Sequence, residues 1–207
     1  MYKPSYFNEE SPEKLHNLIR ENSFATLISV VKGEPVISHL PFFLKGEDKK
    51  TFLLSHMAKA NPHWEIFEKN PKVTVIFQGP HAYISPAWYP PSPVNVPTWN
   101  YAVVHAQGVV RVLREPSQVW ETMGSLISKN ESLYGKNWTV DKAGVQSKMT
   151  NIVAFEIEVT KLDGKFKLSQ QHPQQTREQV AKELLKSPND HARATGKLML
   201  NGPKDMV

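Results

Sequence analysis

The stretch from Gly79 to Tyr101 constrains the fold more than any other part of the sequence. It holds six of the chain's sixteen prolines and five tyrosine or tryptophan residues. Proline fixes φ and removes a backbone donor, so the middle of this stretch fits neither a helix nor a central strand. We therefore predict an ordered, semi-rigid loop between two strands. Its aromatic side chains either line a site or an interface, or simply cover the end of a barrel.

The rest of the chain has the patterns of short strands joined by hairpins and helices. Ser11-Pro12 and Asn61-Pro62 each combine a capping side chain with proline in the first turn, which is a helix start signal. Strands are expected at 24–31, 36–44, 51–57, 72–79, 81–85, 100–113 and from 152 to a turn at 163–164. Helices are expected from Pro12, from Pro62, and at 116–130, 176–187 and 190–200, with 131–150 irregular or weakly helical. This order favours a small closed barrel over a βαβ sheet.

Composition removes several classes of function. The 207 residues suit one compact domain, with or without an appendage. The chain has no cysteine, which excludes disulfides, thiolate catalysis and cysteine–zinc sites. There is no signal-peptide core and no apolar run long enough to span a membrane, so we expect a cytoplasmic protein. The net charge of +5 suits an anionic ligand, but the cations are scattered and give no DNA-binding footprint.

A candidate phosphate cradle follows the third expected strand. The strand ends in Ser55 and His56, and Lys59 precedes the helix cap Asn61. Free backbone N–H groups at a helix start favour an anion, a serine hydroxyl can donate to it, and a lysine adds charge. The alternative is an ordinary helix cap with a solvated lysine.

A second candidate lies at Ser38-His39-Leu40-Pro41. Pro41 interrupts the hydrogen-bond ladder of an apolar strand, so a flat ligand could bond to the freed backbone groups. The alternative is that this is merely an edge strand. Gly108, within the strand expected at 100–113, indicates a bulge or bend.

Catalytic and metal-binding motifs are otherwise missing. The sequence has no nucleophile elbow, Walker loop or dinucleotide fingerprint, and its eight histidines are dispersed, so we assign no catalytic residue and no metal site. The region 176–200 offers two short helices, but the second carries only Arg193 and Lys197 as cations. That is a weak recognition helix, so direct DNA binding is doubtful and a packing or dimer role is favoured.

Several motifs resemble the PaiB family, whose members are described as FMN-binding negative transcriptional regulators. They run in order along nearly the whole chain: Met1-Tyr2-Lys3-Pro4, Ser38-His39-Leu40-Pro41, Ala60-Asn61-Pro62-His63-Trp64, Gly79-Pro80-His81-Ala82-Tyr83-Ile84-Ser85-Pro86, Val96-Pro97-Thr98-Trp99-Asn100-Tyr101 and Lys167-Leu168-Ser169-Gln170. The family typically continues the last motif with Asn, where this chain has Gln171.

The resemblance implies a mainly β fold, an FMN-binding split β-barrel similar to pyridoxamine-phosphate-oxidase-like flavoproteins. Such proteins are homodimers with FMN in clefts between subunits. By position, the phosphate would lie near Ser55, His56, Lys59 and Asn61. The flavin ring would lie along His39, Leu40, Pro41 and Phe42. Trp99, Asn100 and Tyr101 would approach from the other subunit.

The resemblance also frames the domains and the function. Residues 1–170 would form the flavin-binding barrel, and 171–207 a helical extension packed on the barrel or dimer. The chain would be a homodimeric regulator that lowers gene expression. Two alternatives stay open: an FMN-dependent oxidoreductase with indirect regulatory effects, and a flavin-binding protein without catalysis. Whether the protein is an enzyme is left open, because a flavin can carry out hydride chemistry without acid–base motifs from the protein.

Overall fold

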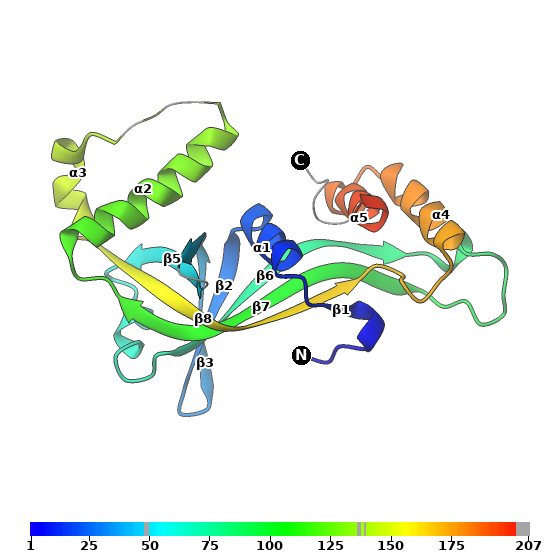
Figure 1. The fold of residues 1–207 in the computed structure, drawn as a ribbon, viewed down its shortest axis with the longest axis horizontal. Coiled ribbons are helices and arrows are strands. Elements are labelled where there is room, and N and C mark those ends of the chain that lie inside the picture. Colours follow the sequence, from blue (N-terminus) through cyan, green and yellow to red (C-terminus); the bar gives the residue numbers. More distant parts are fainter. Residues whose placement is uncertain (48–49, 136–137, 139, 202–207) are drawn as a thin grey trace. The chain divides into compact units, whose positions relative to one another are not determined.

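The computed structural model describes residues 1–47, 50–135, 138 and 140–201. In these residues eight strands form one sheet in the order β3-β2-β6-β7-β8-β5-β4, with β1 beside β8 (Figure 1). The strands are β1 (Asn8–Glu9), β2 (Phe24–Val31), β3 (Glu34–Pro41), β4 (Phe43–Glu47), β5 (Lys50–Ala58), β6 (Lys72–Ile84), β7 (Thr98–Val112) and β8 (Ile152–Lys167). The helices are α1 (Pro12–Glu21), α2 (Pro116–Leu133), α3 (Lys142–Met149), α4 (Gln174–Leu185) and α5 (Asp190–Asn201), with short turns η1 (Ser5–Phe7), η2 (Pro62–Ile66) and η3 (Pro86–Trp88).

The chain divides into two compact units, each made of separate stretches of sequence. The barrel unit consists of residues 23–76 and 106–162. The terminal unit consists of residues 1–22 and 77–105 together with the chain from Asp163 onward. Each of the long strands β6, β7 and β8 therefore gives one part to each unit. The division at residue 170 expected from the sequence stays a prediction, and its last residues, 202–207, lie outside the described residues.

The core of the barrel unit is built from strand side chains that alternate inward. Residues 25, 27 and 29 of β2 are buried while their neighbours are more exposed, as period-two alternation requires. Phe155 of β8 packs against Phe42, with ring centroids 6.3 Å apart, and against Phe67, at 5.2 Å. This aromatic cluster ties the β3–β4 connection to β8 and to the turn after η2.

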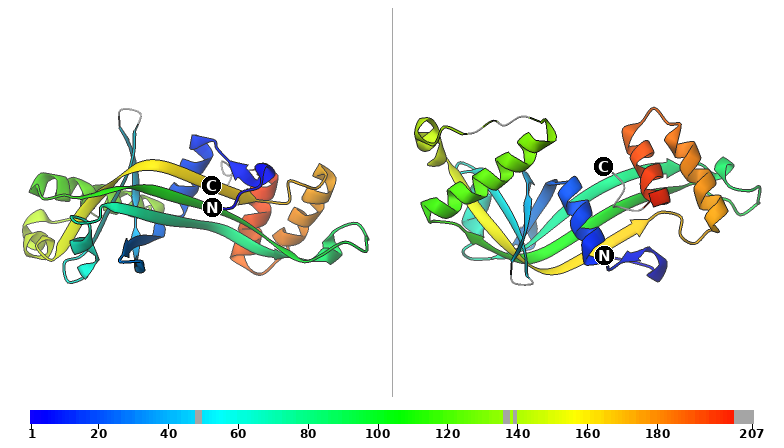
Figure 2. Two further views of the ribbon diagram at one scale, coloured as in Figure 1. Left: turned by 90° about the horizontal axis from the view of Figure 1, so that it is seen from below. Right: turned by 45° about the horizontal axis from the view of Figure 1, so that its top comes forward.

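The terminal unit is organised around α1, which lies across the long strands (Figure 2). Ser11 caps the helix, Pro12 begins it, and Leu15, Leu18 and Ile19 are buried on one face. A Cβ on Gly79 of β6 would lie 2.7 Å from the Leu18 side chain, and one on Gly164 of β8 only 2.1 Å from Leu15. Both glycines therefore let the leucines of α1 approach the strands closely.

Helices α4 and α5 form the C-terminal part of the terminal unit. They lie side by side as a helical pair (Figures 1 and 2). Val180, Ala181 and Leu184 of α4 and Leu198 of α5 are buried, and a Cβ on Gly196 would meet the Ala181 carbonyl oxygen at 2.9 Å. In the described residues, no helix is long and apolar enough to cross a membrane.

Much of the expected secondary structure is confirmed. The strand at 24–31 is β2, the strand at 51–57 lies within β5, and the caps Ser11 and Asn61 each accept a backbone N–H bond from their own helix or turn. The helices expected at 116–130, 176–187 and 190–200 correspond to α2, α4 and α5. The expected stretch at 36–44 is divided at Phe42 between β3 and β4, and the weakly helical stretch contains α3.

Two expected strand ends were wrong. Strands 72–79 and 81–85 are one strand, β6, which continues through Pro80. The register of β2 meets β6 at Thr74–Ile76, so beyond that point one edge of β6 has no β2 partner and can accept a proline. The turn expected at Asp163-Gly164 is instead continuous β8, where Gly164 pairs with Glu9 of β1 and makes room for α1.

Gly108 gives a direct test of the packing in the barrel unit. A Cβ there would lie 2.4 Å from the Glu158 carbonyl oxygen and 2.6 Å from the Ile157 side chain. We expect Gly108→Ala to lower the free energy of unfolding by about 2–3 kcal/mol, because backbone has to move. Urea titration of both variants measures the effect, with Gly124→Ala as the control.

Gly124 is exposed in α2, and a Cβ there meets nothing within 4 Å. Its replacement by alanine should stabilise the protein by up to about 1 kcal/mol through helix propensity. Equal unfolding free energies for the two variants would contradict the close approach of β7 and β8 at Gly108.

Candidate functional site

The structure brings the two predicted ligand-binding segments of the barrel unit together. Ser55 of β5 is fully buried, and its Oγ donates a hydrogen bond of 2.7 Å to the carbonyl oxygen of Pro41 at the end of β3. The hydroxyl predicted to meet a phosphate therefore joins β5 to β3. Strand β3 is the last strand of the sheet path and pairs with β2 along one edge. Its other edge carries backbone groups without a strand partner in the described residues, which a flat ligand can bind.

A buried hydrogen-bond network fixes the turn that follows β5. The Asn61 Nδ2 donates to Ser38 Oγ at 3.2 Å, and Ser38 Oγ lies 2.8 Å from His63 Nδ1. The His63 Nε2 lies 2.9 Å from Ser29 Oγ. Burial lowers the pKa of His63, so its ring is neutral near pH 7, with one donor and one acceptor for the two hydroxyls. The sequence marked Asn61 as a cap but gave no sign of this chain of contacts.

His56 has a buried ring nitrogen without a hydrogen-bond partner among the described residues, although the polar side chains of Ser55, Asn61 and His63 near it in the sequence all form hydrogen bonds. This nitrogen is Nδ1. Burial lowers the pKa of His56, so that the neutral ring is favoured. A buried nitrogen without a partner costs free energy unless another group satisfies it. His56 is therefore a candidate for contact with a bound molecule.

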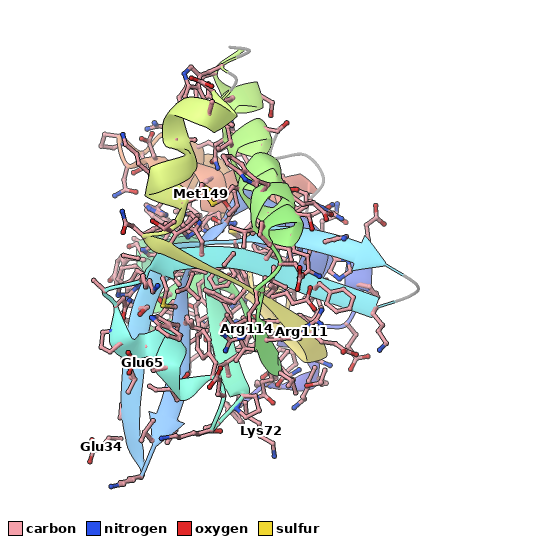
Figure 3. All side chains as sticks on the ribbon, turned by 90° about the vertical axis from the view of Figure 1, so that its left-hand side faces the viewer. Glu34, Glu65, Lys72, Arg111, Arg114 and Met149 are labelled. Atoms are coloured by element: carbon pink, nitrogen blue, oxygen red, sulfur yellow. The ribbon has the colours of Figure 1, made fainter. Side chains whose placement is uncertain are left out.

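Lys59 lies at the rim of a cleft of about 450 Å³ in the barrel unit. Trp64, Arg114, Trp120 and Met149 also line this cleft. Figure 3 labels Arg114, after β7, and Met149, at the end of α3, on this side of the molecule. The indole Nε1 of Trp64 donates to the Lys59 carbonyl oxygen at 2.9 Å, which fixes the backbone at Lys59. The sequence predicted Lys59, but it gave no reason to single out Arg114.

The charges and surfaces around Lys59 fit a flavin phosphate. Lys59 and Arg114 supply two cations at one cleft, although Arg114 also forms an ion pair with Glu68. The N-terminus of the 18-residue helix α2 reaches the same cleft at Pro116 and has no side-chain cap. Cations and uncapped N–H groups favour an anion, while the tryptophans and the free edge of β3 suit a flat ring.

The other predicted contact residues, Trp99, Asn100 and Tyr101, begin β7 in the terminal unit. Asn100 is fully buried, and its Nδ2 donates to Ser169 Oγ at 2.9 Å. Lys167 donates to the Trp99 carbonyl oxygen at 2.6 Å and also bonds to Thr98. Trp99 is exposed and Tyr101 is half-buried. Asn100 therefore stabilises the contact between the start of β7 and Ser169 within the chain. The exposed side chain of Trp99 can contact another molecule.

These features define a class of protein: a flavin-binding split β-barrel. Solved structures confirm this fold. The flavocytochrome Anf3 from Azotobacter vinelandii matches with a TM-score of 0.61 and 11% identity, over 80% of this chain and 72% of that one. The FAD and heme binding protein from Mycobacterium smegmatis matches with a TM-score of 0.59 and 14% identity, over 77% and 73%.

Sequence comparison identifies the family. The family model described as "Putative FMN-binding domain" matches residues 1–161. The protease synthase and sporulation protein PAI 2 of Bacillus subtilis is 36% identical over 210 residues, which cover 100% of both chains. An uncharacterized protein of Emericella nidulans is 32% identical over 223 residues, covering 87% of this chain and 88% of that protein. The chain belongs to the PaiB family of FMN-binding proteins, and its cofactor is FMN.

Proposed function

We propose that this protein is a cytoplasmic, homodimeric FMN-binding regulator that lowers gene expression. The observation that carries the proposal is the free edge of β3 beside the turn that carries Lys59, to which β3 is joined by the hydrogen bond from Asn61 to Ser38. The Bacillus subtilis relative is named a protease synthase and sporulation protein. The proposed regulatory role rests on the family to which the chain belongs. The proposed geometry of flavin binding rests on the residues of this chain.

In this proposal the FMN phosphate lies at Lys59 and Arg114, close to His56 and the Asn61 turn. The flavin ring lies along His39, Leu40, Pro41 and Phe42, where the carbonyl of Pro41 is held by Ser55. The side chain of Phe42 is buried in the aromatic core and its backbone N–H donates to the Ser23 carbonyl oxygen at 2.8 Å, so this residue would shape the edge of the flavin site. The bound flavin supplies hydride-transfer chemistry. The protein's part is to orient the ring and to neutralise the phosphate.

The dimer is supported by the exposed apolar face of the β2–β3 hairpin. Phe24 is 70% exposed and Ile37 is 53% exposed. In the hairpin register Ile37 lies opposite Ile28, and Phe24 lies opposite Pro41, so these residues share the outer face of the two strands. Large exposed apolar patches mark contact surfaces. In the proposed dimer the partner subunit approaches the flavin with the segment Trp99, Asn100 and Tyr101, in which the fully buried Asn100 would hold the strand while Trp99 and Tyr101 make the contact.

An FMN-dependent oxidoreductase with indirect regulatory effects is the second candidate. The charge of α5 favours it. Arg193 bonds to the Ser187 carbonyl oxygen and pairs with Asp190 in the same helix, which leaves Lys197 as the remaining cation of that helix in the described residues. A helix with so little free positive charge is poorly suited to a DNA groove.

The FMN site is tested by replacing Lys59 with alanine. Loss of one charge-assisted phosphate contact should weaken FMN binding by about 1–2 kcal/mol, or about 5–30-fold. Fluorescence titration of FMN measures the change. Lys72→Ala is the matched control, because Lys72 is exposed at the start of β6 and lies outside the cleft of Lys59 (Figure 3). Equal FMN affinity in both variants would move the phosphate elsewhere.

The dimer is tested at Ile37. A lysine at this position would place a charge in the proposed apolar interface, so Ile37→Lys should convert the dimer to monomer. Sedimentation velocity at several protein concentrations reports the change. Tyr134→Lys adds the same charge at an exposed aromatic residue outside the hairpin and should leave the dimer intact. A dimer that survives Ile37→Lys would exclude the β2–β3 face as its interface.

Regulation is tested by binding to duplex DNA. If only the net charge of +5 acts, binding should be weak, indifferent to sequence and lost steeply as salt rises. Fluorescence anisotropy with a promoter fragment and a scrambled duplex measures both properties. This outcome would mean that any effect on transcription is indirect. Tight and sequence-selective binding would instead establish direct regulation.

A further inference from the structure

A second cleft, of about 470 Å³, lies in the terminal unit, and Trp99 is the residue of its lining that the proposed flavin site also uses. Its walls come from β6, η3, the start of β7 and the turn between α4 and α5. The aromatic side chains that line it are His81, Tyr83, Trp88, Trp99 and His191. Clefts of about 300–1,000 Å³ with apolar walls are the usual size of small-molecule sites.

The rings in this cleft form a connected series. Trp99 meets Tyr83 edge-on, with centroids 6.2 Å apart and planes at 76°. On the other side it meets His81, also at 6.2 Å, and His81 lies 4.5 Å from His191 at an interplanar angle of 35°. Trp99 is 53% exposed and Tyr83 is 48% exposed. The series therefore keeps ring surface in water that a planar ligand would cover.

The charged groups in the cleft balance each other, and Ser187 and Asn189 add uncharged polar groups. Glu183 and Lys186, on α4 and just after it, form an ion pair of 2.7 Å. The His81 Nδ1 lies 3.4 Å from the carbonyl oxygen of Gly79, which favours a proton on Nδ1 and leaves Nε2 to accept. A charged ligand would have to compete with the existing ion pair. An uncharged ring with one hydroxyl or N–H group fits the lining better.

We propose that this cleft binds an uncharged planar aromatic molecule of one or two fused rings. Such a molecule lies against Trp88 and Trp99 and donates a hydrogen bond to an imidazole. It connects β6 and β7 to the turn between α4 and α5, so binding steadies the helical pair. His81 and Trp99 also line a separate cleft of about 310 Å³, together with Gln78 and Tyr101. Trp99 is in addition a predicted flavin contact of the partner subunit, so the binding test is made on the FMN-loaded protein.

Calorimetric titration of the FMN-loaded protein with naphthol tests the proposal. Decahydronaphthol, with the same skeleton and hydroxyl but no aromatic ring, is the matched compound. Naphthol should bind at least about tenfold more tightly, because only it offers a ring face. Trp88→Leu should weaken naphthol binding about tenfold. Trp138→Leu, which removes a 56% exposed tryptophan of the barrel unit, should leave it unchanged.

Hydrogen exchange of the same samples locates the ligand. Naphthol should slow exchange at residues 81–88 and 183–192, and this protection should be lost in Trp88→Leu. Equal binding of the two compounds, or equal binding by wild type and Trp88→Leu, would overturn the proposal. So would protection of these segments that depends on protein concentration and not on naphthol, since it would assign the aromatic surface to a contact between copies.

Discussion

The buried histidine His63 is the contact on which the candidate flavin site depends. Its two ring nitrogens meet Ser29 of β2 and Ser38 of β3, and Ser38 in turn accepts from Asn61. The β2–β3 hairpin and the turn after β5 are thereby held together by Ser29, Ser38 and His63, which are almost completely shielded from water, with Asn61 half-buried at the end of the network. In that setting each lost partner leaves a desolvated polar group, so the network has one well-satisfied arrangement. This hydrogen-bond network fixes the positions of the edge of β3 and of the turn that carries Lys59.

A second network performs the same task in the terminal unit. The motif around Trp99-Asn100-Tyr101 and the motif Lys167-Leu168-Ser169-Gln170 interlock, because Asn100 bonds to Ser169 and Lys167 bonds to the Trp99 carbonyl oxygen. Ser169 adopts a φ of 64°, a left-handed conformation that costs free energy for a residue with a Cβ. Its hydroxyl contacts Asn100 and lies 3.4 Å from the Tyr89 hydroxyl. Two motifs that look like ligand-binding signatures thus also hold the ends of β7 and β8 together.

The sequence predicts local structure well where a single side chain determines it. Ser11 and Asn61 were recognised as caps because capping needs only a short polar side chain and the next few N–H groups. Strand β2 was recognised because its alternation is local. The continuity of β6 through Pro80 and of β8 through Gly164 was not, because each depends on which strand or helix lies beside it.

The same limit applies to the site. Lys59 follows a strand and precedes a capped turn, so its neighbours in the sequence suffice to propose a phosphate contact there, which stays a prediction. Arg114 looks like any polar residue after a strand, and only folding brings it to the cleft of Lys59. The destination of the Ser55 hydroxyl, a backbone carbonyl of β3, likewise depends on strand pairing. Contacts made by neighbouring residues of one segment can be predicted from the sequence. Contacts between segments that only folding brings together cannot.

The fit of α1 against Gly79 and Gly164 has a consequence for the protein's synthesis. Helix α1 leaves the ribosome before β8, and Gly164 is made more than a hundred residues later. At elongation rates of about 5–20 residues per second, Leu15 and Leu18 must wait on the order of ten seconds before their docking surface is complete. The amphipathic first helix is therefore exposed to chaperones or to other nascent chains for that interval. The last residue of the barrel unit, Leu162, is made before Gly164, so the chain of the barrel unit is available for folding before the terminal unit can close around α1.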